Sequence, residues 1–500
     1  MSPRLARGRI RRRRGSRRQA RPPKLSRMHA QPQCDGRHSR IRVRWLPHPW
    51  HCGRLEFMSA GTITAAERRR SRNSVIYGSA GTVVEWFDYG LYLYLVPVVA
   101  PLIFPTDDQL TAIIASLGVF AAGSLLRIAG GAFFGSIGDR LGRKKALVLS
   151  ILMMTVPMGL TAFLPTYAQI GIAATILFTV MRMLQGFSAG GEYSGTVVQL
   201  VEQAPAARRG FIASTAVFTS GIGVLLASGL VALMTTVLSE QDMASWGWRI
   251  CYLVGGALGL FALVMRSRME ETQAFESEEE AGTVPAKPLR YALRHLPGPV
   301  LMAAFLAGFG GILYYVVLGF VPTILDTYSE IQSDTALWVT TGMTIVYAFA
   351  TPFFGLLSDR LGRKPVMIGA TIGFVLLSFP LLWLMTYEPL WIVILAGLGL
   401  LTLLMLYGGP VVAAIGEQFP SRARYSALAT GYNLGTAVLG GFAPMVAAWL
   451  ISVFDSPVAP AGLLVVASLV ALPLLWRLHE TRGITLAEMD QIARQGEPVP

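Results

Sequence analysis

The chain has 500 residues, of which 53% are hydrophobic and only 14% are charged. Such a composition excludes an ordinary soluble domain, because apolar runs of about 20 residues, long enough to cross a bilayer as helices, recur along the chain. The net charge of +14 is concentrated at one end: residues 1–57 contain 17 Lys and Arg against Asp35 and Glu56, and the remainder has 26 basic and 27 acidic residues.

Residues 1–57 form a basic extension that lacks the apolar core of a signal peptide. Its RIRRRRGSRRQARPPK run has the charge of an arm for nucleic acid or anionic lipid, whereas a disordered or untranslated extension is the simpler interpretation. Met58 begins a polar lead (58–74) of the kind expected before a first membrane helix, so we expect translation to start there. Beyond it Cys251 is the single cysteine, which excludes a disulfide framework.

Twelve apolar segments follow, and each is predicted to be a membrane-spanning helix. A longer connection at 266–298, with an ESEEE run and several prolines, is predicted to be a cytoplasmic linker between an N-terminal half (75–265) and a C-terminal half (299–478). Residues 479–500 form a tail, in which ITLAEMDQIARQ has the pattern of a short amphipathic helix. The predicted helices cover 75–104, 109–138, 146–165, 168–200, 211–238, 247–265, 299–327, 335–358, 365–386, 389–417, 425–452 and 458–476.

Loop charges set the orientation of this all-α membrane protein. With the N-terminus in the cytoplasm, the lead, the cytoplasmic loops and the tail carry 23 Lys and Arg, whereas the opposite loops carry none. The other three basic residues beyond residue 57 are Arg127, Arg182 and Arg249, which fall in the apolar segments or at their ends. This asymmetry follows the positive-inside rule and predicts that both termini are cytoplasmic.

A charged ten-residue pattern occurs twice, between predicted helices 2 and 3 and between helices 8 and 9. GSIGDRLGRK (135–144) returns 220 residues later as GLLSDRLGRK (355–364), which indicates two related halves. Its glycines permit close backbone approach, and its Asp and Arg can pair across the cytoplasmic seam or cap a neighbouring helix. A turn that only anchors topology is the alternative. The predicted gate residues are Gly135, Asp139, Arg140, Gly142, Arg143, Asp359, Arg360, Gly362 and Arg363.

Ionisable residues inside the N-terminal half are candidates for proton coupling, because such residues are costly in a membrane and face a cavity or a partner. Glu85 and Asp88 share one face of helix 1, and Arg127 lies on helix 2. With Arg182 and Glu192 on helix 4, three carboxylates face two guanidiniums, and a carboxylate left without a partner takes up a proton. We expect Asp88 or Glu85 to carry it. Arg127 and Arg182 would then hold partners or an anionic substrate group; a static ion-pair network is the alternative.

Glu192 is open to two roles. Helical spacing places it on one stripe with Arg182 and Gln185, which favours proton handling. Its position near the cytoplasmic end of helix 4, close in sequence to Arg208 and Arg209, favours a gate or a helix cap.

Polar and aromatic side chains on several helices are candidates for a central cavity. The glycine-rich GFGG and GYNLG stretches beside them indicate broken backbone that suits a cavity lining. Asn433 is the strongest candidate, because a buried amide needs partners, whereas single tyrosines also serve as packing or interface anchors. The predicted cavity residues are Tyr89, Tyr92, Gln185, Tyr314, Tyr315 and Asn433, with Tyr432 beside the last.

The sequence lacks the motifs of ATP-driven transport and of zinc-dependent hydrolysis. No G-x-x-x-x-G-K-[ST] or H-E-x-x-H pattern occurs, and His295 and His479 are the only histidines beyond the extension. We therefore expect no enzyme activity, no cofactor other than the proton as coupling ion, and no metal. Prolines inside the predicted helices, such as Pro157 and Pro352, fit kinked and mobile helices.

The chain resembles the major facilitator superfamily, whose cytoplasmic signature both ten-residue copies match apart from Ser358. Four finer motifs resemble its metabolite–proton symporters: EWFDYGLY (85–92), RMLQGFSAGGE (182–192), GWRI (247–250) and EQFPSRARYSALATGYNLGTAVLGGFAP (417–444). The chain departs from that pattern at Tyr193-Ser194, where Trp-Gly is often seen, and at Ile128, where Pro is usual. The resemblance implies a multi-pass protein of the bacterial inner membrane that works as a monomer, with a small molecule and a proton as partners, membrane lipid around it and no nucleic acid.

The resemblance also frames the substrate. Similar carriers take up organic acids such as α-ketoglutarate, citrate and shikimate, or zwitterions such as proline and betaine, and Arg127 and Arg182 suit the carboxylate that both classes share. Because osmolyte carriers often have a long C-terminal helical extension and this chain ends soon after helix 12, we expect an organic acid, with proline or betaine as the alternative. A drug–proton exporter and a non-transporting sensor on the same fold are further alternatives.

Overall fold

The structure is a computed structural model that describes residues 65–104, 109–282, 286–321, 324–325, 333–387 and 389–495. The basic extension and the expected start at Met58 lie outside these residues. Every regular element within them is helical. Eleven of the described helical stretches are long and apolar enough to cross a membrane, and Pro460–Trp476 supplies a shorter twelfth. The predicted twelve-helix fold is confirmed.

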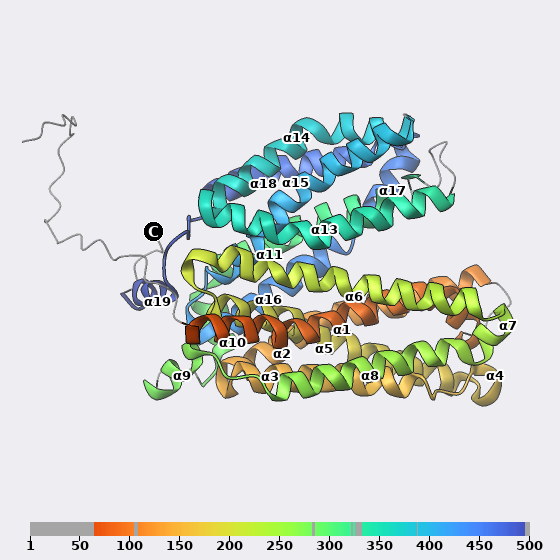
Figure 1. Cartoon of the computed structure of the whole chain (residues 1–500), viewed down its shortest axis with the longest axis horizontal. Helices are drawn as coiled ribbons and strands as arrows, with labels where there is room; N and C mark the ends of the chain where they lie inside the picture. Colours follow the sequence, from red (N-terminus) through yellow and green to blue (C-terminus); the bar gives the residue numbers. More distant parts are fainter. Residues whose placement is uncertain are drawn as a thin grey trace, which may run out of the picture. The chain divides into compact units, whose positions relative to one another are not determined.

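The N-terminal half is built from six membrane-spanning helices and short connecting elements (Figure 1). Its elements in chain order are α1 (Ala65–Ile103), α2 (Gln109–Leu141), α3 (Arg143–Thr161), α4 (Tyr167–Ile170), α5 (Ile172–Gln203), η1 (Ala206–Arg208), α6 (Arg209–Val237), α7 (Glu240–Asp242), η2 (Met243–Gly247) and α8 (Trp248–Ser267).

The linker, the C-terminal half and the tail follow. The linker holds α9 (Gln273–Glu280) and α10 (Pro288–His295), and the tail holds the expected amphipathic helix, α19 (Leu486–Gln495). The elements of the C-terminal half are α11 (Pro297–Tyr314), η3 (Tyr315–Phe320), α13 (Ser333–Leu361), α14 (Arg363–Tyr387), α15 (Leu390–Gly416), η4 (Ser421–Ala423), α16 (Arg424–Gly435), η5 (Thr436–Gly440), α17 (Ala443–Phe454) and α18 (Pro460–Arg477).

Most helix bounds differ from the sequence prediction by a few residues, and three differences change its interpretation. The first helix already begins at Ala65, inside the polar lead. The fourth predicted helix is divided at Gly171, whose φ of 62° ends α4 and starts α5. The sixth helix continues through Arg266, which is fully buried rather than part of a solvated linker.

Glycine-rich faces let α2 and α5 pack backbone against backbone. A Cβ on Gly130 would overlap the carbonyl of Phe187, and one on Gly190 would overlap the backbone of α2 at Arg127 and Gly131. Small residues are what permit such close helix approach within a membrane. The tight pair holds Arg127 and Arg182, one on each helix, at fixed positions in the interior.

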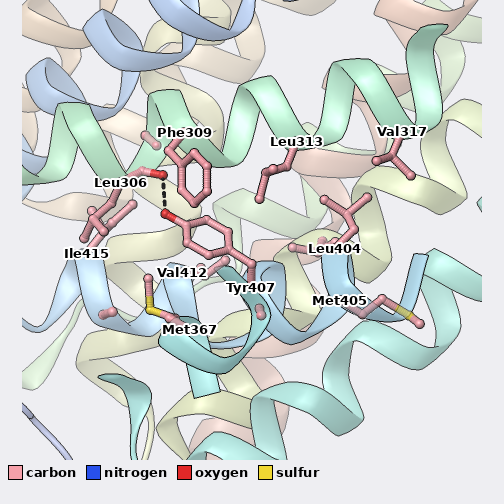
Figure 2. Close-up of a cluster of buried hydrophobic side chains, with 14 of the residues drawn as sticks. Leu306, Phe309, Leu313, Val317, Met367, Leu404, Met405, Tyr407, Val412 and Ile415 are labelled. Atoms are coloured by element: carbon pink, nitrogen blue, oxygen red, sulfur yellow. Dashed lines mark hydrogen bonds between the residues drawn. The ribbon is translucent and has the colours of Figure 1, made fainter. Parts of the chain in front are cut away.

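The two halves meet mainly along two helix pairs, α6 with α13 and α2 with α16. In the C-terminal half, α11 and α15 enclose an apolar cluster around Tyr407 (Figure 2). The Tyr407 hydroxyl donates a hydrogen bond of 2.8 Å to the carbonyl of Leu306, which satisfies the one polar atom of a fully buried ring. One side of the central cavity is lined by residues of this cluster, namely Leu306, Leu404, Tyr407, Val412 and Ile415.

Both glycine-rich stretches lead into a turn of π-helix, in agreement with the broken backbone predicted there. GFGG in α11 precedes η3, and GYNLG in α16 precedes η5. π-Helical turns interrupt the regular hydrogen-bond ladder and occur often at functional sites. Here they place Tyr315 and Thr436 at the lining of the cavity.

Candidate functional site

Each carboxylate predicted inside the N-terminal half has a guanidinium partner. Glu85 pairs with Arg127 at 3.0 Å, and Asp88 pairs with Arg182 at 3.4 Å. The third pair joins Glu192 to Arg266. The sequence count of three carboxylates against two guanidiniums was therefore wrong, because Arg266 was assigned to a cytoplasmic loop and lies buried at the end of α8.

Arg127 of the first pair has three polar partners. Its Nε donates to the Asn433 side-chain oxygen at 2.6 Å, and one Nη donates to the Tyr89 hydroxyl at 3.3 Å. Its other Nη faces Glu85, whose two carboxylate oxygens are buried and accept no hydrogen bond from any described residue. Glu85 therefore relies on one ion pair for its charge, a weak arrangement for a buried carboxylate.

The second pair, Asp88 with Arg182, has both polar and aromatic partners. Asp88 accepts from Arg182 and also from the Gln185 amide at 2.9 Å, so helical spacing of the two α5 residues brings both to one carboxylate. The Arg182 guanidinium lies 4.6 Å from the centre of the Tyr92 ring and 5.3 Å from that of Tyr252, within cation–π range. Asp88, Tyr89, Arg182 and Gln185 line a small cavity of their own.

Glu192 lies in a third polar cluster of the N-terminal half, separate from the Glu85 and Asp88 pairs. It accepts from Ser150 at 2.6 Å and pairs with Arg266, which also donates to Thr196 and to the carbonyl of Gly78. These contacts join α1, α3, α5 and α8 inside one half. Its partner is thus Arg266, rather than the neighbouring Arg208 or Arg209.

The large cavity lies between the halves and is rich in aromatic rings. A cavity volume of about 120 Å³ is surrounded by side chains of α1, α2, α5, α6, α11, α13, α15 and α16. Arg127 is the single charged residue among the described lining residues. The aromatic lining residues are Trp86, Tyr193, Tyr314, Tyr315, Tyr347, Tyr407 and Tyr432.

The predicted cavity residues take four different positions. Tyr314 and Tyr315 line the large cavity, and Tyr89 and Gln185 line the small one. Tyr92 is buried, with its hydroxyl bonded to the Ser116 carbonyl at 2.6 Å. Asn433 bridges the halves: its oxygen accepts from Arg127 and its nitrogen donates to the Gly190 carbonyl at 2.8 Å.

Sequence reasoning missed Trp86, Tyr193 and Tyr347 as lining residues. Trp86 lies next to Glu85 in the EWFDYGLY motif, and Tyr193 follows Glu192 directly. Both are adjacent to residues that the sequence singled out, yet which helix face they occupy depends on helix rotation. The sequence therefore indicated that these residues lie near the site, but it did not indicate that their side chains face the cavity.

On the cytoplasmic side, two aspartates of the repeated pattern cap helices of the opposite half. Asp139 of α2 accepts from backbone amides in the first turn of α16, and Asp359 of α13 accepts from the first turn of α6. A carboxylate at a helix N-terminus is favoured by the exposed amides and the helix dipole. The distances are 3.2 and 2.8 Å from Asp139 to Tyr425 and Ser426, and 2.8 and 2.9 Å from Asp359 to Gly210 and Phe211.

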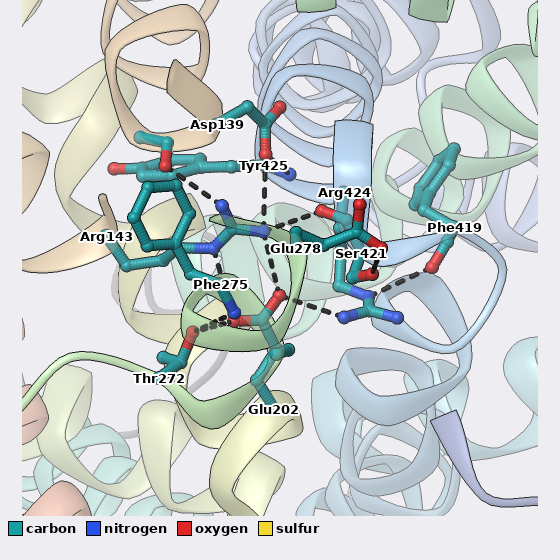
Figure 3. A network of polar contacts seen from close by, with 12 residues as sticks. Asp139, Arg143, Glu202, Thr272, Phe275, Glu278, Phe419, Ser421, Arg424 and Tyr425 are labelled. Atoms are coloured by element: carbon teal, nitrogen blue, oxygen red, sulfur yellow. Dashed lines mark hydrogen bonds and ion pairs between the residues drawn. The ribbon is translucent and has the colours of Figure 1, made fainter. Parts of the chain in front are cut away.

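Arginine–glutamate clusters accompany each cap, and Figure 3 shows the first of them. Glu202 binds Arg143 of its own half at 3.0 Å and Arg424 of the other half at 2.9 Å. The second cluster repeats this arrangement, with Glu417 binding Arg363 at 3.3 Å and Arg209 at 3.0 Å. The cytoplasmic ends of the halves are thus joined by two related charge clusters.

The other predicted gate residues are two arginines and three glycines, and they have different roles. Arg140 and Arg360 are exposed, outside both clusters. A Cβ on Gly135 would meet the Ser426 backbone, so this glycine permits the contact between α2 and α16. Gly142 and Gly362 have φ of 106° and 105°, a turn conformation that favours glycine.

Glu202 and Glu417 were missed as members of the cytoplasmic charge clusters, although the sequence holds their signal. E-Q-A-P-A-A-R-R begins at Glu202, and E-Q-F-P-S-R-A-R begins at Glu417. Each Glu therefore precedes by seven residues the Arg that pairs with the other Glu. This second internal repeat has the same symmetry as the ten-residue pattern.

Comparison with known proteins agrees with this architecture. The sequence profile of the Major Facilitator Superfamily matches residues 79–330 and 311–491. A glycine betaine/proline/ectoine/pipecolic acid transporter of Dickeya dadantii is 32% identical over 430 residues, covering 84% of this chain and 85% of the relative. The proline/betaine transporter of Escherichia coli K12 is 31% identical over 442 residues, covering 86% of this chain and 88% of the relative.

Solved structures show the same fold at lower identity. The proton:xylose symporter bound to 6-bromo-6-deoxy-D-glucose aligns with a TM-score of 0.69 and 20% identity, over 85% of this chain and 99% of that one. A partially occluded inward-open form of the Escherichia coli xylose transporter aligns with a TM-score of 0.62 and 19% identity, over 83% of this chain and all of that one.

Proposed function

The chain belongs to the Major Facilitator Superfamily, and we propose that it couples proton entry to uptake of a small zwitterionic osmolyte of the proline or betaine type. It is a multi-pass transporter of the bacterial inner membrane and not an enzyme. The observation that carries the proposal is the position of Arg127, at once the charged residue of the large cavity and the ion-pair partner of Glu85.

The coupling follows from competition for one guanidinium. A substrate carboxylate that enters the cavity binds Arg127 best through its Nη groups, one of which is held by Glu85. If the substrate takes that position, Glu85 is left buried without a counter-charge, which is costly unless it takes up a proton. Substrate and proton therefore bind together, as symport requires.

Movement between the two halves then carries both across the membrane. The cytoplasmic charge clusters hold the halves together below the cavity in this structure. Arg127 also donates a hydrogen bond to Asn433 of the C-terminal half. A change in the ion pair of Arg127 therefore alters a contact between the two halves. Opening to the cytoplasm requires that these contacts break.

The cavity favours a zwitterion over the organic acid that the sequence led us to expect. A di- or tricarboxylate needs several cationic partners, and the described lining residues of the large cavity include Arg127 as their one cation. A zwitterion brings one carboxylate and its own compensating cation. The proline/betaine transporters among the relatives support the same substrate class.

Proteoliposomes with an internal pH dye test the proposal. Proline, glycine betaine, ectoine, α-ketoglutarate, citrate and shikimate are added singly, and zwitterions are expected to acidify the lumen while the polycarboxylates do not. Acidification by a polycarboxylate alone would restore the organic-acid interpretation. Uptake of labelled betaine without any proton movement would contradict proton coupling and leave the substrate class standing.

A further inference from the structure

A group of aromatic rings lines the large cavity. The Tyr314 ring is at its centre, with ring centroids 6.1 Å from Trp86, 5.4 Å from Tyr315 and 5.7 Å from Tyr347. The Trp86 and Tyr315 rings stand nearly perpendicular to that of Tyr314, at 72° and 83°. Rings at these separations are in edge-to-face contact with one another, and all four line the large cavity.

The rings come from both halves of the protein. Trp86 belongs to α1, whereas Tyr314 and Tyr347 belong to α11 and α13. Trp86 also lies 6.0 Å from Tyr89, the residue whose hydroxyl accepts from Arg127. The aromatic group is thus connected to the guanidinium that would hold a substrate carboxylate.

The cavity offers poor partners for an N–H ammonium. Its described lining residues include no Asp or Glu, and the nearby Glu85 is fully buried behind Arg127. The lining hydroxyls of Ser220, Thr344 and Thr436 donate to carbonyls of their own helices, so these hydroxyls and those of the lining tyrosines offer an ammonium only neutral oxygen acceptors. An ammonium with N–H groups would exchange strong hydration for neutral oxygen acceptors.

A quaternary ammonium has no N–H group to satisfy, and aromatic faces attract it through their quadrupoles. From the proposed function we infer that Trp86, Tyr314 and Tyr347 form a subsite for the quaternary ammonium head of the substrate, while Arg127 receives its carboxylate. The subsite makes N-methylation the feature that the transporter recognises. Betaines are then preferred over amino acids that share the same carboxylate.

A methylation series tests this subsite. Binding of glycine, sarcosine, dimethylglycine and glycine betaine to the purified protein is measured by isothermal titration calorimetry. We expect affinity to rise with each methyl group, by about tenfold or more across the series, since the quaternary head gains a desolvated cation–π contact. Flat or falling affinity would overturn the inference.

A neutral isostere separates charge recognition from simple apolar contact. In 3,3-dimethylbutanoate the quaternary nitrogen of glycine betaine is replaced by carbon, so shape and carboxylate are kept and the cation is lost. We expect it to bind at least tenfold more weakly than glycine betaine, because the rings attract the positive charge. Equal or tighter binding of the isostere would overturn the cation–π assignment.

Paired variants locate the subsite. Tyr314→Phe keeps the ring and is expected to keep the methylation trend, whereas Tyr314→Leu is expected to flatten it. A trend unchanged in Tyr314→Leu would place the cation elsewhere. These binding measurements do not depend on proton movement, so proton uptake driven by proline with no methylation trend would reject the subsite and leave the proposed function intact.

Discussion

Among the buried carboxylates of the N-terminal half, Glu85 has the poorest hydrogen bonding. Asp88 accepts from Arg182 and Gln185, and Glu192 accepts from Ser150 and Arg266, whereas the oxygens of Glu85 have the ion pair with Arg127 alone. A charge held by one partner is the easiest to neutralise when that partner is taken away. Geometry therefore favours Glu85 over Asp88 as the proton-carrying residue.

The Glu85→Gln variant tests this choice. A neutral amide imitates the protonated carboxyl and leaves Arg127 free for the substrate, so substrate affinity should be high and independent of pH. In the unmodified protein affinity should fall as pH rises, by at most about tenfold per pH unit for one linked proton. Calorimetric titration with glycine betaine between pH 5.5 and 8.5 measures both slopes.

Asp88→Asn is the matched control, because Asp88 lies one helical turn away and lines the small cavity. We expect it to keep the pH slope. If Asp88→Asn removes the slope and Glu85→Gln retains it, the roles of the two carboxylates are exchanged.

Asn433 links the ion pair to the seam between the halves. Removing its amide in Asn433→Ala breaks the bonds to Arg127 and to the Gly190 carbonyl, and hydrogen bonds to charged groups contribute about 1.5–3 kcal/mol. We expect the cytoplasm-closed state to lose population by about tenfold. A cysteine at the buried Ser426, in a background without Cys34, Cys52 and Cys251, should react correspondingly faster with a maleimide.

The control for Asn433→Ala is Thr430→Ala, one turn earlier on the same helix, whose hydroxyl bonds only to the Ser426 carbonyl among the contacts described. It should leave the labelling rate unchanged. Equal labelling in Asn433→Ala and the parent would show that the bridge does not hold the seam closed.

At the scale of elements, the linker and the tail have equivalent roles at the two helices that follow the ten-residue repeats. Glu271 accepts from the first amides of α3 at 3.0 and 3.1 Å, and Glu480 accepts from those of α14 at 3.0 Å each. Each Glu is followed by a Thr that bonds to a gate glutamate, Thr272 to Glu202 and Thr481 to Glu417. The tail therefore contacts its charge cluster in the same way as the linker contacts the other one.

Glu271→Ala and Glu480→Ala should have matching effects. Each removes the acceptor for two amides at a helix N-terminus, and loss of such a cap costs about 1 kcal/mol. We expect both variants to lower the melting temperature of the purified protein and to raise the labelling rate at the Ser426 cysteine. An effect from one variant and none from the other would contradict the equivalence of linker and tail; Glu279→Ala, on an exposed part of α9, serves as the surface control.

Much of this could be predicted from patterns that act along the chain. Apolar length predicted the helices, and the repeat of GSIGDRLGRK predicted the place of the cytoplasmic charge clusters. Arg266 was misassigned because a basic residue at a helix end has the same composition whether it faces water or a buried Glu192. The rings of Trp86 and Tyr347 were missed because helix rotation, set by packing between helices, decides which side chains face the cavity.

At the scale of the whole molecule, the two halves are tied at the cytoplasmic side by two related sets of contacts. The Asp139 cap fixes α16 to α2, and the Asp359 cap fixes α6 to α13. Because both helix pairs lie on the same seam, opening toward the cytoplasm must break both. The two caps therefore stabilise the same cytoplasm-closed state from different positions.

Asp139→Asn, Asp359→Asn and the double variant test this arrangement. Each single change weakens two charge-assisted hydrogen bonds, about 1.5–3 kcal/mol in total, and should shift the population toward the cytoplasm-open state by tenfold or more. Because the caps share no partner, their free energies should add, so the double variant shifts the population by the product of the single factors. Distance distributions between spin labels on the cytoplasmic ends of the halves measure the populations. A double variant no more open than either single one would mean that one cap alone holds the halves together, and the equivalence of the two repeats in gating would be lost.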